Sequence, residues 1–223
     1  MMKRQWLFVG GIARSGTTLM ARLLTLHPEG FVTAECGYPL ALWWGLTMPP
    51  AGYTFAHWQG AGQEASTPWI LPRLRQYDDP AEVVRAMCEG YIERLHPTVR
   101  VCGDKTPMLG ALHPRRDGRR VWEDLRLLWP DCKLLWMDRP LEEAIASGLR
   151  VWPHRKEADQ RADALERLDG QRLCADALWV PLADLNARPR EVLGEVLNWV
   201  GLPQAAYPWD EALKYFEPGH RVN

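Results

Sequence analysis

The sequence predicts an α/β fold in which helices cover both faces of a central parallel sheet, a three-layer sandwich. Short apolar segments that read as strands alternate along the chain with segments of helical periodicity. The segment Cys132–Met137 is almost wholly apolar, as in a strand that is covered on both faces. The length of 223 residues suits one compact domain with its own core, so we expect a single domain over residues 1–223.

The first elements are indicated by apolar spacing and by helix breakers. Gln5–Val9 is short, apolar and followed by two glycines, which predicts a buried strand and a tight turn. From Thr17 to Leu26 the leucines and Met20 recur at helical spacing, and His27-Pro28 ends this helix. Residues 48–78 are irregular, and a loop of that length in a compact domain is more often functional than idle.

The rest of the chain continues the alternation. Asp79 and Pro80 predict the start of a helix that runs to about His96, with the aspartate as cap and the proline in the first turn. The remaining elements are strands at Val99–Cys102 and Cys132–Met137 and helices that begin at Pro140, span Arg155–Asp169 and run from Pro189 to Gly201. Because ligands bind beyond the carboxyl ends of such strands, the residues after each strand are the candidates for chemistry.

The composition narrows the possible partners and the location. With 47% hydrophobic and 25% charged residues and a net charge of −1, the chain has no general attraction to nucleic acid or acidic membranes, and neither is expected as a partner. No apolar run reaches the length of a membrane-spanning helix, and the first is too short for a signal peptide. The five cysteines, odd in number and without metal-ligand spacing, predict reduced thiols in a cytoplasmic protein and no metal site.

A glycine-rich loop follows the first strand and reads Gly10-Gly11-Ile12-Ala13-Arg14-Ser15-Gly16-Thr17-Thr18. Glycines let backbone N–H groups converge on an anion, and the next helix points its positive end at the same place. Arg14 adds a permanent cation, and the two threonines add hydroxyl donors. Glycines alone also fit an ordinary turn, but this combination favours a 5′-phosphate site. Its expected binding residues are Gly11, Arg14, Ser15, Gly16, Thr17 and Thr18.

This loop differs from the usual nucleoside-triphosphate loop, because Thr17 stands in the lysine position and the cation moves to Arg14. Arg-Ser-Gly-Thr-Thr resembles the 5′-phosphosulfate loop of sulfotransferases, and the stretch through His27-Pro28 is most similar to the tyrosylprotein sulfotransferase branch and its bacterial relatives. The resemblance implies a P-loop-type fold and transfer of a sulfuryl group to an acceptor hydroxyl. It also implies the co-substrate 3′-phosphoadenosine-5′-phosphosulfate (PAPS), with adenosine 3′,5′-bisphosphate as product.

A second segment of the resemblance follows the strand at Cys132–Met137. Arg139 precedes a helix, and Ser147, eight residues later, lies about two turns into it. The matching arginine and serine of sulfotransferases hold the 3′-phosphate of PAPS, which implies that role for both residues here. From the residues alone, Arg139 also fits a surface cation at a helix start and Ser147 a small packing residue.

The resemblance also implies the catalytic groups. Gly103–Pro107 is similar to a family segment containing Lys-Thr-His, so Lys105 is implied, with Arg14, at the leaving group, while Pro107 stands in the position of the histidine base. Glu35 lies twenty-one residues after Arg14, the offset of the catalytic glutamate in the tyrosylprotein branch, and is implied as the general base. With two fixed cations no metal is needed. A solvated loop lysine and a surface glutamate are the alternatives.

The acceptor side and the nucleotide cover stay open. The segment around Val180–Leu185 resembles a family segment containing Tyr-Glu-Asp-Leu, but Leu182 and Ala183 replace its tyrosine and glutamate. What covers the adenine is therefore open, and a homodimer that completes the site is possible. Several of the twelve tryptophans lie within residues 43–69, where they either wall an acceptor pocket or pack a core or dimer contact. The acceptor is a small molecule or a peptide, and a peptide tyrosine, a sugar hydroxyl and a metabolite hydroxyl all fit.

Two other functions fit part of the pattern. A P-loop kinase that uses ATP and magnesium would place Asp138 after a strand, but the loop lysine is missing and ATP has no 3′-phosphate for Arg139 and Ser147. A degenerate nucleotide-binding module without activity would agree with Leu182 and Ala183.

Overall fold

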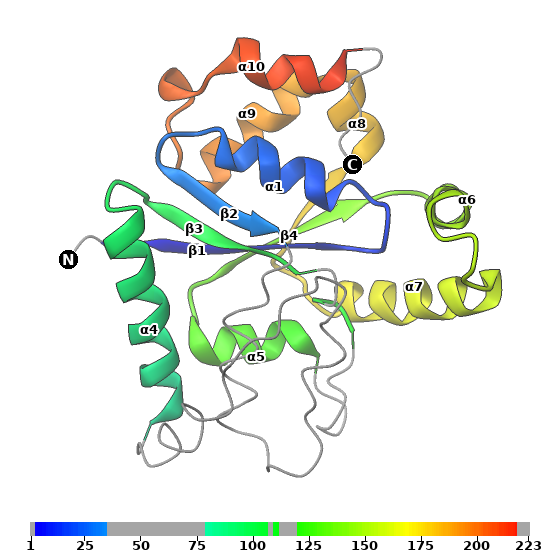
Figure 1. Cartoon of the computed structure of the whole chain (residues 1–223), viewed down its shortest axis with the longest axis horizontal. Coiled ribbons are helices and arrows are strands. Elements are labelled where there is room, and N and C mark those ends of the chain that lie inside the picture. The colour runs from blue at the N-terminus through cyan, green and yellow to red at the C-terminus, as the bar shows by residue number, and fades with distance from the viewer. Residues whose placement is uncertain (1–2, 35–78, 107–108, 112–119, 218–223) are drawn as a thin grey trace.

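The fold is built on a five-stranded sheet in which every pair of neighbouring strands is parallel (Figure 1). The structure is a computed structural model that describes residues 3–34, 79–106, 109–111 and 120–217. The strands, in the spatial order β2-β3-β1-β4-β5, are β1 (Gln5–Gly11), β2 (Gly30–Ala34), β3 (Val101–Lys105), β4 (Lys133–Asp138) and β5 (Leu178–Pro181). β1 is the middle strand, so the loop that follows it is flanked by the ends of β3 and β4.

Helices lie on both faces of the sheet, which confirms the predicted three-layer sandwich (Figure 1). One face carries α1 (Thr17–Thr25), α8 (Leu182–Ala187), α9 (Pro189–Val200) and α10 (Trp209–Leu213), with short 3₁₀ turns at Gln204–Ala206 and Lys214–Phe216. The other face carries α4 (Pro80–Leu95), α5 (Val121–Leu128) and α7 (Glu157–Arg172). α6 (Leu141–Val151) lies next to α7, beyond the carboxyl end of β4.

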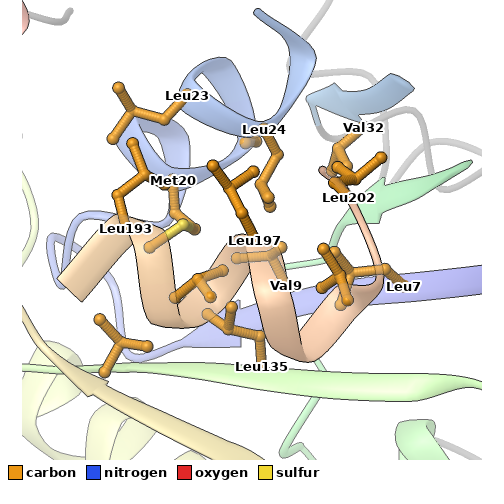
Figure 2. Packing of buried hydrophobic residues seen from close by; sticks show 14 of the residues in the cluster. Leu7, Val9, Met20, Leu23, Leu24, Val32, Leu135, Leu193, Leu197 and Leu202 are labelled. Carbon is orange, nitrogen blue, oxygen red and sulfur yellow. The ribbon is translucent and has the colours of Figure 1, made fainter. Parts of the chain in front are cut away.

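The strands divide the core into two clusters because successive side chains point to opposite faces. Leu7 and Val9 of β1 pack with leucines of α1 and α9, as Figure 2 shows. Trp6 and Phe8 of the same strand pack on the other face, against α4 and α5. This double burial explains why β1 has a continuous apolar sequence. No helix in the described ranges is both long and apolar enough to cross a membrane.

Several predicted element bounds need correction. The expected strand at Val99–Cys102 is β3, which runs to Lys105, so the charged residues expected in a loop lie within a strand. β2 and β5 were not predicted, because each is short and lacks a long apolar run. α5, α8 and α10 were not predicted either, and the helix expected at 155–169 is α7, two residues further on at its start and three at its end.

The start of α4 is confirmed in detail. Asp79 is the N-cap, and its side chain accepts a hydrogen bond of 2.9 Å from the backbone N–H of Ala81. Pro80 occupies the first turn, where its missing N–H costs no helical hydrogen bond. Both local signals read from the sequence therefore act as predicted.

A candidate nucleotide site at the carboxyl ends of the strands

The loop between β1 and α1 turns through two left-handed residues. Gly16, the N-cap of α1, has φ 95°, and Arg14 has φ 68°. Glycine adopts this conformation without strain, whereas a residue with a side chain gives up on the order of 1–2 kcal/mol. Side chains also crowd this turn, since a Cβ atom at Gly16 would lie 2.7 Å from a methyl carbon of Leu182. Strain of this kind at Arg14 is typical of functional loops.

Ser15 is the buried centre of the loop. Its side chain is fully buried, and among the described residues its hydroxyl has no hydrogen-bond partner. A Cβ atom at Gly11 would lie only 2.2 Å from that hydroxyl oxygen, so glycine is required there. A buried hydroxyl without a partner costs free energy, and an anionic oxygen held in the loop would accept its hydrogen bond. Together with the first-turn N–H groups of α1, these donors fit a phosphate.

Lys105 meets the start of α1 although 87 residues separate it from Thr18. It is the last residue of β3, is 4% exposed, and lies opposite Val9 of β1 in the sheet. Its ammonium group donates a hydrogen bond of 3.3 Å to the hydroxyl of Thr18. The pairing of β3 with β1 therefore places a buried cation beside the first turn of α1, the helix that follows the glycine-rich loop.

Arg14 joins the loop to α6. Its Nε donates to the hydroxyl of Ser147 at 3.4 Å, and its guanidinium carbon lies 6.0 Å from the ring centre of Trp152. Arg139 reaches back from the end of β4, donating from Nη1 to the carbonyl oxygen of Arg14 at 3.0 Å and from Nε to Glu143 at 3.4 Å. Two guanidinium groups and one buried hydroxyl thus come together, and the contact of Arg14 with Ser147 was not expected from the sequence. Trp152 was not predicted, because its place depends on where α6 ends.

The predicted general base lies outside the described residues. This holds for Glu35, for Pro107 and for the tryptophan-rich stretch 43–69. The strand before Glu35 is described, however, and Ala34 at its end is paired with Lys105 of β3. Ala34 directly precedes Glu35 in the sequence, so the described part of the chain before the predicted base ends beside the predicted leaving-group lysine.

Asp104 is a charged residue of the site region to which the sequence analysis assigned no role. It is 2% exposed and accepts hydrogen bonds from the hydroxyls of Thr33, at 2.7 Å, and Thr106, at 3.1 Å. Asp104 stands out in the structure because it is an aspartate inside a strand that is buried along its whole length. In the described parts of the chain, no group of three histidine, cysteine or acidic side chains is placed to hold a metal ion.

The sequence and the fold are similar to those of known sulfotransferases. The sequence profile of the sulfotransferase family matches residues 7–206. No protein of curated function matches the sequence. Among solved structures, the sulfotransferase domain of the Synechococcus olefin synthase superposes with a TM-score of 0.65 at 19% identity, covering 98% of this chain and 79% of that one.

Two further solved structures have the same fold. The sulfotransferase domain from the curacin biosynthetic pathway gives a TM-score of 0.62 at 14% identity and covers 100% of this chain and 81% of that domain. A sulfotransferase from Mycobacterium tuberculosis gives 0.53 at 19% identity, with 97% and 72% covered. At these identities the likeness shows the fold alone, and the fold is the predicted one.

Proposed function

The chain belongs to the sulfotransferase family, and we propose on this basis that it moves a sulfuryl group from PAPS to a hydroxyl of an acceptor. One observation carries the proposal beyond the family. Lys105 at the end of β3 bonds to the start of α1, and Arg139 after β4 and Ser147 of α6 bond to Arg14 of the loop between β1 and α1. Cationic and hydroxyl groups therefore surround this loop, as binding of a nucleotide with two phosphate groups requires.

The loop suits the 5′ end of PAPS. Gly11, Ser15 and Gly16 shape a turn with a buried hydroxyl inside it, and Thr17 and Thr18 begin the helix behind it. A 5′-phosphate there would receive hydrogen bonds from the loop and from the helix terminus. Each hydroxyl or N–H that points at a charged oxygen gives a stronger bond than a neutral pair does.

The arginines beside α6 suit the 3′-phosphate. Arg139 and Ser147 are the residues for which the resemblance implies this role, and the structure adds the guanidinium of Arg14, which bonds to Ser147. Arg14 was expected at the leaving group, but in this arrangement its side chain points to α6. We therefore include Arg14 in the 3′-phosphate site and leave Lys105 as the leaving-group cation.

The proposed reaction is an in-line transfer between two oxygens. The bond between sulfur and the 5′-phosphate oxygen breaks while the acceptor oxygen bonds to sulfur, and the acceptor proton passes to Glu35. Negative charge grows on the leaving phosphate oxygen, where the ammonium of Lys105, held at Thr18, would stabilise it. Positioning and charge neutralisation do most of the work in transfers of this kind. The acceptor is a small molecule or a peptide bearing a hydroxyl.

The deciding experiment compares nucleotides by thermal unfolding without magnesium and then measures transfer from labelled PAPS to a panel of hydroxyl acceptors. At a hundred times its dissociation constant, adenosine 3′,5′-bisphosphate adds about 2.7 kcal/mol to the stability, which raises Tm by roughly 5–10 °C in a chain of this size. ADP, which lacks the 3′-phosphate, should raise Tm much less. Equal shifts, or a strict requirement for ATP with magnesium, would instead support the kinase.

A further inference from the structure

We propose that Asp104 is a positioning residue for catalysis, which ties the ends of β2 and β3 together and so holds Lys105 in place. This inference rests on the proposed role of Lys105 at the leaving group. It assigns a function to a buried carboxylate that the proposed reaction does not otherwise use.

The carboxylate is shared between two strand ends. One oxygen, Oδ1, accepts from Thr33 of β2, which is its register partner across the sheet, and the other, Oδ2, accepts from Thr106, two residues further along its own chain. Asp104 is 2% exposed and Thr106 is 1% exposed, so water competes little for these bonds. Hydrogen bonds to a buried carboxylate are stronger than neutral ones.

These two hydrogen bonds involve the residues on either side of Lys105 in the chain. Lys105 lies between Asp104 and Thr106 in the chain and is paired with Ala34, the residue after Thr33, in the sheet. The backbone N–H of Thr106 also donates to the carbonyl of Val9 at 2.9 Å, which joins this segment to β1. The backbone that carries the lysine is therefore fixed to both neighbouring strands, and one side chain, Asp104, makes two of the bonds.

The charge of Asp104 argues against a direct role at the nucleotide. A carboxylate repels phosphate and sulfate groups, so it would weaken binding if it touched them. Burial of a charge is also costly unless hydrogen bonds compensate it. The two threonine hydroxyls supply such bonds, and the carboxylate then acts on the strand ends rather than on the substrate. The alternative is a residue that only stabilises the fold.

A double-mutant cycle with Lys105 separates positioning from stability. Asp104→Ala removes both ties, and kcat should fall about tenfold or more, since small misplacements of a catalytic group have effects of that size. The dissociation constant for adenosine 3′,5′-bisphosphate should stay within about twofold of the wild-type value, because the loop after β1, Arg14 and Arg139 are unchanged. In the Lys105→Ala background, Asp104→Ala should change kcat by less than about twofold, because there is no lysine left to position.

Conservative variants sharpen the cycle. Asp104→Asn keeps the shape and offers an acceptor to one hydroxyl, so it should recover part of the loss in kcat. Thr106→Val removes one tie without changing the volume, and should lower kcat about threefold in the wild-type background and not in Lys105→Ala. If Asp104→Ala does not fold, Thr106→Val carries the same test, with Thr33→Val as its counterpart on β2.

Two results would overturn the inference while leaving the proposed function intact. One is an equal loss of kcat from Asp104→Ala in both backgrounds, and the other is a lowered Tm with normal kcat. Normal turnover of Lys105→Ala would remove the role of Lys105 and this inference with it. Failure of the proposed function shows differently, as a wild-type protein that neither binds adenosine 3′,5′-bisphosphate nor transfers sulfate.

Discussion

Two cationic regions of the site differ in how the fold holds them. Lys105 is 4% exposed and lies in a strand that is paired on both sides. By contrast, the side chain of Arg139 is 23% exposed, and Arg14 is an exposed residue of the loop after β1. The lysine is thus placed by the sheet, and the arginines are placed by side-chain contacts around α6. A buried, fixed cation suits charge that develops in the transition state, while accessible arginines suit recognition of a phosphate present throughout. We therefore expect the strand ends to govern kcat and the α6 side to govern nucleotide selection.

The largest expected effect concerns turnover and the predicted base, Glu35, which follows β2 in the sequence. Glu35→Gln keeps the shape of the predicted base and removes its proton-accepting charge. Turnover should fall about a hundredfold or more, the usual scale for a general base, while affinity for adenosine 3′,5′-bisphosphate is retained. Single-turnover transfer from labelled PAPS measures the first quantity and calorimetry the second. Near-normal turnover would assign the base to another residue.

Lys105→Ala tests the strand ends, at the leaving group. We expect kcat to fall about thirtyfold to a hundredfold, with the acceptor KM nearly unchanged, because the ammonium acts on charge that appears only in the transition state. Lys133→Ala is the matched control, since Lys133 begins β4 at the opposite end of the sheet and is half-buried, which lowers its pKa. The control should keep its kcat. A change confined to the acceptor KM would contradict the leaving-group role.

Arg139→Ala tests the α6 side, where binding rather than turnover should change. The variant loses a charge-assisted bond to the 3′-phosphate, so affinity for adenosine 3′,5′-bisphosphate should fall about tenfold and approach that for 5′-AMP. Affinity for 5′-AMP itself should hardly change. Arg150→Ala, an exposed arginine in the last turn of α6, is the control and should preserve the preference. An equal loss for both nucleotides would place Arg139 at the 5′ end instead.

The same contrast explains how much the sequence could predict. The loop from Gly10 to Thr18 and the strand before it are local signals, and both were found. β3 was placed too early because Asp104 and Lys105 are charged, which usually indicates a loop. Their burial depends on Thr33, Thr106 and Thr18, residues that other parts of the fold bring to them.

Contacts around α6 mark a second limit. Arg139 and Ser147 were selected because they stand at a fixed spacing, but the bond from Arg14 to Ser147 spans 133 residues. This bond forms only because of the direction in which α6 extends from the end of β4, and the apolar periodicity of the sequence does not predict that direction. The same holds for Trp152, which follows the last turn of α6.

Trp152→Leu should have the smallest effect and is the most selective probe of the α6 side. The indole lies 6.0 Å from the guanidinium carbon of Arg14, near the limit of a cation–π contact, which contributes about 0.5–1 kcal/mol when partly exposed. Affinity for adenosine 3′,5′-bisphosphate should therefore fall about twofold to fivefold, with kcat at saturating PAPS unchanged. Trp209→Leu is the control, because Trp209 makes a similar contact with Arg190, at 5.2 Å, in the α9–α10 layer outside the site. A loss of kcat in Trp152→Leu larger than its loss of affinity would mean that Arg14 acts on the leaving group after all, and that the two cationic regions work as one.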